Sequence, residues 1–181
     1  MDTKNIERYL NSFGQKVVQD AQANLASKKG STALGNSIRF EVVTDEQGFS
    51  TRFYMDDYGE YLDKGVSGNK QKQSFEDYKG TTRSSPYSYT SKGPPIDIIS
   101  KWIKKKGIEP KGLGRGRSKN TGQYISGFAY LISRKIKRDG IKSLSFFQKP
   151  LGVEYETLKE NLLKELKLDI ETYITTFYRP K

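Results

Sequence analysis

The sequence predicts an α+β fold, in which a long N-terminal helix and further helices pack on a small antiparallel β-sheet and long polar loops join them. Three observations support this class. Apolar residues recur at helical spacing near both ends of the 181-residue chain. Between them, two short segments alternate apolar and polar residues, as strands with one buried face do. Aromatic residues make up 12% of the chain, which argues against general disorder.

The first expected element is a helix over residues 3–29, and a β-hairpin follows it. The apolar residues of this helix are spaced three or four apart: Ile6, Leu10, Phe13, Val17, Ala21 and Leu25. Gly14 interrupts the helix at a cost of about 1 kcal/mol, so a bend is expected there. Residues 38–43 and 49–55 alternate on either side of a polar turn, which predicts a hairpin with one buried face.

A short helix is expected next, within residues 56–65, with Asp at its start and Gly at its end. Residues 66–93 are polar and predict a long structureless loop, which in a compact domain is normally functional or mobile. Tyr78, Tyr87 and Tyr89 are the main apolar surface of this loop, and the stretch 87–90 could add a strand.

Pro94 and Pro95 predict the start of another helix, because Pro is favoured in a first helical turn. Its expected buried stripe is Ile96, Ile99, Trp102 and Ile103, which places the only Trp of the chain in the core. Gly107 after three lysines predicts the end of this helix, because cations complement the helix dipole and Gly supplies a left-handed cap. The Ile103–Ile108 pair predicts the hydrophobic contact of a Schellman cap.

A Gly-rich basic loop is expected over residues 107–122. Together with the lysines before it, its basic residues are Lys104, Lys105, Lys106, Lys111, Arg115, Arg117 and Lys119. These residues could follow DNA phosphates without reading bases, or they could form a solvated surface or a protein-contact arm.

Two more helices complete the expected fold. The first spans about residues 121–138 and buries Ile125, Phe128, Ala129, Ile132 and Ile136. Pro150 is expected to end the connection that follows. The last helix begins at about residue 153, and its apolar stripe is Leu158, Leu162, Leu166, Ile170, Tyr173 and Phe177. No composition break marks a second domain, so residues 1–181 are expected to form one structural domain.

Composition narrows the classes of function. The chain contains no Cys and no His, which excludes disulfides, Cys/His zinc sites, cysteine nucleophiles and Ser-His-Asp triads. The carboxylates of Asp56, Asp57, Glu60 and Asp63 lie too close in sequence to converge from separate elements, so we expect them to cap one short helix. We therefore expect no enzyme, no metal and no cofactor. No apolar run is long enough to span a bilayer and no secretory signal is present, so no membrane contact is expected.

Two segments carry a resemblance to a known family. They are the signature Tyr-Gly-Glu-Tyr-Leu-Asp-Lys-Gly at 58–65 and the stretch Pro-Ile-Asp-Ile-Ile-Ser-Lys-Trp-Ile-Lys-Lys-Lys-Gly-Ile at 95–108. A helix at 129–136 running into Gly140, the pair Phe146–Phe147 and a terminal amphipathic helix follow in the same order. This order of elements resembles the tail-completion and head–tail joining proteins in the necks of long-tailed bacteriophages.

The resemblance implies a structural virion protein that forms a ring, with sixfold or twelvefold symmetry, between the portal or adaptor and the tail tube. Assembly would take place in the cytoplasm of the bacterial host. In that family the aromatic signature and the Trp helix shape the core and the subunit contact. We expect Tyr58 and Tyr61 to lie in the core or in a subunit or partner contact. Tyr78, Tyr87 and Tyr89 could equally form subunit or partner contacts or pack against their own domain.

The net charge of +11 leaves an alternative, a sequence-independent nucleic-acid-binding protein.

Overall fold

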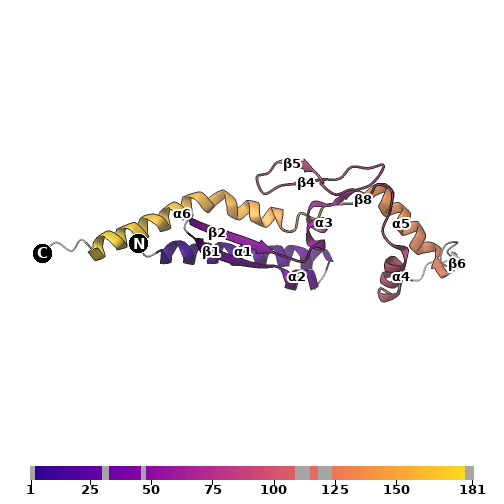
Figure 1. Cartoon of the computed structure of the whole chain (residues 1–181), viewed down its shortest axis with the longest axis horizontal. Coiled ribbons are helices and arrows are strands. Elements are labelled where there is room, and N and C mark those ends of the chain that lie inside the picture. The colour runs from indigo at the N-terminus through magenta and orange to yellow at the C-terminus, as the bar shows by residue number, and fades with distance from the viewer. Residues whose placement is uncertain (1–2, 30–32, 46–47, 109–114, 118–123, 178–181) are drawn as a thin grey trace. The chain divides into compact units, whose positions relative to one another are not determined.

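The computed structural model describes residues 3–29, 33–45, 48–108, 115–117 and 124–177 (Figure 1). The fold is α+β, as predicted. The chain divides into two compact units, each with its own apolar cluster. Unit 1 comprises Met1–Asp63, Glu76–Thr82 and Leu144–Lys181, and unit 2 comprises Lys64–Phe75 and Arg83–Ser143.

Unit 1 is built on two long helices and one hairpin. Its elements are α1 (Lys4–Lys29), α2 (Ala33–Ser37), β1 (Arg39–Asp45), β2 (Gly48–Tyr54), α3 (Tyr58–Lys64) and α6 (Gln148–Phe177). Helix α6 runs antiparallel to α1, because Lys16 pairs with Glu154 at 2.5 Å whereas Asn5 bonds Asp169 further along α6. The predicted first helix and hairpin are confirmed, with Phe40 opposite Phe53 in the β1–β2 register.

The core of unit 1 lies between α1, the hairpin and the start of α6. Its buried members are Phe13, Val17, Ala21, Leu25, Leu34, Ile38, Phe146 and Phe147. Gly14 has a packing role in the unbroken helix α1. A Cβ atom at Gly14 would lie 2.6 Å from Cε2 of Phe40, so the absence of a side chain lets the hairpin approach the helix.

Unit 2 pairs two helices, α4 (Ile96–Lys105) and α5 (Gly127–Asp139), through Ile99, Ile103 and Ala129. Strands β3 (Val66–Ser67) and β8 (Gly140–Ile141) pair, as do β6 (Arg115–Arg117) and β7 (Tyr124–Ser126). The C-terminus of α4 is the predicted Schellman cap. Gly107 has φ +62°, its N–H donates to Lys104 O at 3.1 Å, and the Ile108 N–H donates to Ile103 O at 3.1 Å.

The prediction of a structureless loop over residues 66–93 was wrong. This stretch contains β3, β4 (Ser74–Glu76) and β5 (Thr82–Ser84), and β4 pairs with β5. The proposed strand at 87–90 is a single parallel bridge, in which the Tyr89 N–H donates to Ser67 O and Tyr87 O accepts from the Ser67 N–H, both at 2.8 Å. Short strands of polar residues satisfy the hydrogen bonds of their backbone groups without an alternating apolar pattern, so the sequence carried no signal for these strands.

Three further expectations need correction. Trp102 is 47% exposed and not in the core, because the narrow buried face of α4 is filled by Ile99 and Ile103. Helix α5 begins at Gly127, because the preceding residues, including Ile125, pair with β6 as strand β7. Helix α6 begins at Gln148, with Pro150 in its first turn, where the missing proline N–H would have had no helical partner.

None of the helices in the described part of the chain is long and apolar enough to cross a membrane.

Candidate functional site

The side of the signature segment at 58–65 that faces the core of unit 1 has a structural role. Asp63 is 2% exposed, and its Oδ1 accepts hydrogen bonds from the N–H groups of Phe147 at 2.8 Å and Gln148 at 3.4 Å. These N–H groups lie directly before α6 and at its first residue, so a carboxylate distant in sequence caps this helix and complements its dipole. The Asp63 and Leu62 carbonyls also accept from Ser145 and Leu144.

Glycine is needed at two positions of this segment, because neighbouring atoms approach the backbone too closely to leave room for a side chain. A Cβ atom at Gly59 would lie 2.6 Å from Sδ of Met55. Gly65 has φ +74°, and a Cβ atom there would lie 2.8 Å from the Ile141 carbonyl oxygen.

The two tyrosines of the segment lie on its outer side. Tyr58 and Tyr61 are each 45% exposed. Tyrosine is favoured in protein interfaces because its large ring loses little conformational entropy. Their proposed role in partner contact stays a prediction.

The other three tyrosines pack partly against their own unit. Tyr78 is half-buried, its ring meets the ring of Tyr155 edge-on at 5.0 Å between centroids, and its N–H donates to Gln148 Oε1. Tyr87 and Tyr89 are also half-buried, beside β3. Burial raises the pKa of Tyr89.

The four carboxylates at 56–63 do not converge. Asp63 is the buried cap, whereas Asp56, Asp57 and Glu60 are exposed. Across the described residues, no group of three or more acidic side chains is arranged to hold a metal ion.

The predicted basic loop is described in part. Lys104, Lys105 and Lys106 are exposed at the end of α4. The backbone of Arg115 and Arg117 forms β6, whereas Lys111 and Lys119 lie outside the described residues.

Charge is divided unequally between the units. Counted over the sequence, unit 2 has 18 Lys or Arg and three acids, a formal +15, whereas unit 1 has 14 Lys or Arg and 18 acids, a formal −4. These values add to the +11 of the chain. The whole cationic surplus therefore belongs to unit 2.

A groove of about 880 Å³ lies along α5 in unit 2 and concentrates part of this charge. We call it the α5 groove, and its principal lining residues are Lys70, Tyr130, Arg134, Lys135, Lys137 and Arg138. Sequence reasoning missed it. The available signal was the pair Arg134 and Arg138, four residues apart on one helical face, but Lys70 joins them only through the fold.

Unit 1 has an exposed apolar surface on the distal half of α6. We call it the α6 stripe, and it consists of the exposed Leu163, Ile170, Tyr173, Ile174 and Phe177 together with the half-buried Leu166. At 100° per residue, these positions fall within an arc of about 100°. The predicted stripe of the last helix is thus half-buried at Leu158 and exposed at its end, where Phe177 is 69% exposed.

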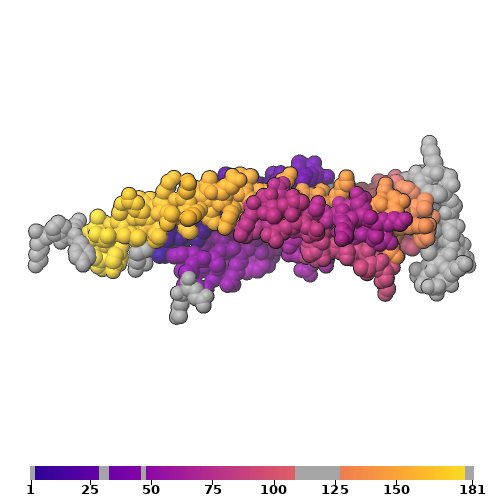
Figure 2. Space-filling model, turned by 90° about the horizontal axis from the view of Figure 1, so that it is seen from above, coloured from indigo at the N-terminus to yellow at the C-terminus, as the bar shows by residue number. Residues whose placement is uncertain are grey.

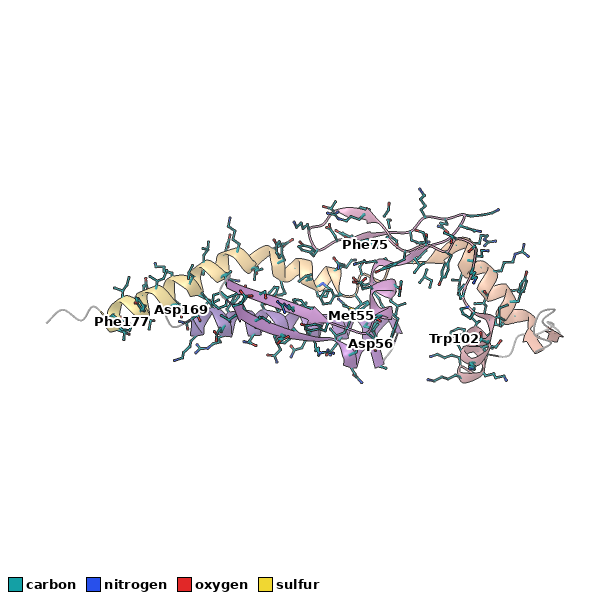
Figure 3. All side chains as sticks on the ribbon, viewed as in Figure 1. Met55, Asp56, Phe75, Trp102, Asp169 and Phe177 are labelled. Carbon is teal, nitrogen blue, oxygen red and sulfur yellow. The ribbon has the colours of Figure 1, made fainter. Side chains whose placement is uncertain are left out.

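The end of α6 passes beyond α1. Asp169 accepts hydrogen bonds from the N–H groups of Asn5 and Ile6, each at 3.1 Å, so it marks the level at which α1 begins (Figure 3). Residues 170–177 add about 12 Å of helix past this level, at 1.5 Å per residue. In Figure 2, the yellow end of α6 extends past the other described segments of unit 1 on this face.

In comparisons with protein-family models, curated proteins and solved structures, no match to this chain was found.

Proposed function

We propose that this chain is a structural subunit of the neck of a tailed bacteriophage, which forms a ring between the portal or adaptor and the tail tube. The α6 stripe is the observation that carries this proposal. A continuous apolar surface on a charged helix is typical of a protein–protein contact, because the free energy falls when a partner removes exposed apolar area from water. The whole-chain resemblance supplies the identity of the assembly.

The energy available to such a contact is substantial. Ile170, Tyr173, Ile174 and Phe177 are between 40% and 69% exposed. Full burial of a large apolar side chain contributes about 1.5–3 kcal/mol, so covering the exposed part of these four gives roughly 1 kcal/mol each. A ring repeats this contact between every pair of neighbours, which makes assembly cooperative.

The exposed tyrosines extend the proposal to α3. Tyr58 and Tyr61 provide a second, separate surface in unit 1, and head-to-tail ring contacts need two different surfaces on each subunit. In this account no side chain carries out chemistry and no cofactor is bound. The protein is located in the virion neck after assembly in the host cytoplasm.

The assembly surface is tested by native mass spectrometry of the full chain. The double substitution Ile170→Ser with Ile174→Ser removes two residues of the stripe and should abolish or weaken oligomers. Val153→Ser with Leu168→Ser is the matched control, because both residues are exposed on α6 outside the stripe. Equal oligomerisation of the two variants would contradict the proposed contact.

A second candidate function, sequence-independent nucleic-acid binding, is favoured by the unequal charge. A formal +15 on unit 2 attracts polyanions at long range and favours binding through counterion release. The two functions are compatible, because a neck subunit stands where the genome passes. A steep decrease of DNA affinity with salt would support this candidate, and no retention of DNA at physiological salt would contradict it.

A further inference from the structure

We infer that the α5 groove is a binding site for the backbone phosphates of double-stranded DNA. This inference rests on the second candidate function and names the residues that perform it. They differ from the basic residues that the sequence indicated at 104–119, since they come from α5 and from the loop between β3 and β4.

The cations of the groove are available to a ligand. Lys70, Arg134 and Lys135 are exposed, and they make no ion pair with any residue in the described part of the chain. Arg138 is held by Asp139, through Nε to Oδ1 at 2.6 Å and Nη2 to Oδ2 at 2.8 Å. This pair keeps the pKa of Asp139 below its usual range, and the nearby charge of Lys135 lowers it further, so this one acid acts on two of the groove cations.

The loop that supplies Lys70 is fixed on the end of α5. The N–H of Asn69 donates to Lys137 O at 2.9 Å, and the N–H of Lys70 donates to Arg138 O at 3.0 Å. Gln73 adds a bond from Nε2 to Asp139 O at 2.7 Å. The free carbonyl groups at a helix C-terminus normally repel anions. These hydrogen bonds occupy three carbonyl groups at the C-terminus of α5.

Close packing makes this loop position rigid. A Cβ atom at Gly68 would overlap the Arg138 carbonyl, and Gly140 has φ +79°, which favours glycine. The backbone that carries Lys70 is therefore fixed at the end of α5 before a ligand arrives.

The geometry suits phosphates and not base edges. Arg guanidinium groups bind phosphate oxygens in a bidentate way, and Arg134 is exposed and outside the Arg138–Asp139 pair. Tyr130, which is 48% exposed one turn before Arg134, adds a hydroxyl donor to the same groove. Contacts of this kind position a duplex and carry no sequence information.

DNA is a better partner for this groove than an acidic surface of another copy. Unit 1 is the acidic part of this chain, but its formal charge is only −4. Such a surface would neutralise a small part of the +15 on unit 2. A duplex presents one negative charge per about 1.7 Å of its axis and could neutralise the groove completely.

The test uses the full chain and a fluorescent duplex of arbitrary sequence, with affinity measured by anisotropy over a range of salt concentrations. The groove variant is Lys70→Gln, Arg134→Gln and Lys135→Gln. The control variant is Lys149→Gln, Lys159→Gln and Lys164→Gln. It removes three exposed cations from α6 and gives the same net charge. Circular dichroism confirms that both variants are folded.

The groove variant should bind at least about tenfold more weakly, and the slope of log affinity against log salt should become less steep by about 2.7, at 0.9 per lost phosphate contact. The control should keep the wild-type slope. If both variants change equally, or if neither changes while wild type binds DNA, the groove assignment fails and DNA binding stands. If wild type binds no DNA, both fail. Loss of salt-sensitive self-association by the groove variant alone would overturn the assignment in favour of an acidic partner copy.

Discussion

Asp63 is the residue whose removal tests the architecture of unit 1 most sharply. Asp63 is 2% exposed, and its carboxylate accepts hydrogen bonds from the N–H groups of Phe147, directly before α6, and Gln148, the first residue of α6. A hydrogen bond to a charged group contributes about 1.5–3 kcal/mol, and loss of a helix cap costs about 0.5–2 kcal/mol. These values describe overlapping effects, so we expect Asp63→Ala to lower the free energy of unfolding by about 2–4 kcal/mol.

Urea denaturation of the full chain, followed by two signals, measures this effect. Far-UV circular dichroism is dominated by the long helices α1 and α6 of unit 1, whereas Trp102, the only Trp, reports on unit 2. The transition seen by circular dichroism should move to lower urea, and the Trp102 transition should move less.

The control for this experiment is Asp57→Ala, which removes an exposed carboxylate from the same segment and changes the net charge equally. Its expected effect is below about 0.5 kcal/mol. Equal loss of stability in the two variants would refute the capping argument. A wild-type transition for Asp63→Ala would refute it too.

Three other expectations follow from the same structure. Gly14→Ala should destabilise the protein by about 1–3 kcal/mol in thermal unfolding, because the overlap with Phe40 outweighs the gain of about 1 kcal/mol in helix propensity; a rise in Tm would contradict this packing. Asp169→Ala should cost about 1–3 kcal/mol in the same assay, since it leaves N–H groups of Asn5 and Ile6 without their acceptor; an unchanged Tm would show that the N-terminus of α1 does not depend on α6. Burial raises the pKa of Tyr89 in the folded state, so the neutral phenol should contribute its full stabilisation at neutral pH, and this stabilisation should decline as pH rises from the ordinary tyrosine pKa toward the folded-state pKa. The difference in tyrosinate absorbance between wild type and Tyr89→Phe measures the folded-state pKa of Tyr89. An ordinary tyrosine pKa would contradict the burial of this side chain.

Elements with a repeating apolar pattern could be predicted from the sequence. Helix α1 buries one face and the β1–β2 hairpin half-buries one, so periods of about 3.6 and 2 are visible in their residues. The cap at Gly107 was predictable for a similar reason, because its chemistry is local.

Features made by distant residues could not be predicted. The α5 groove joins Lys70 to Arg134, and the α6 cap joins Asp63 to Phe147, and no local pattern encodes either pairing. Trp102 was misplaced because α4 has apolar residues on more than one face, including the exposed Ile98, so spacing alone did not identify the buried side. Ile125 was misplaced because a strand residue followed a helical spacing by coincidence.

The unequal division of charge was visible only after the units were defined. The segments of unit 1 are separated in sequence by those of unit 2, so a count along the chain mixes acidic and basic parts. Once the fold assigns each segment, the net +11 resolves into a basic unit and a slightly acidic one.

The central claim is that this protein is a ring-forming component of a phage neck, and quantitative mass spectrometry of phage particles purified from the source of the sequence tests it most directly. We expect the protein to be present in particles at a copy number equal to one sixfold or twelvefold ring. Absence from particles, with abundant protein in the infected cells, would contradict the neck assignment and leave nucleic-acid binding as the better account.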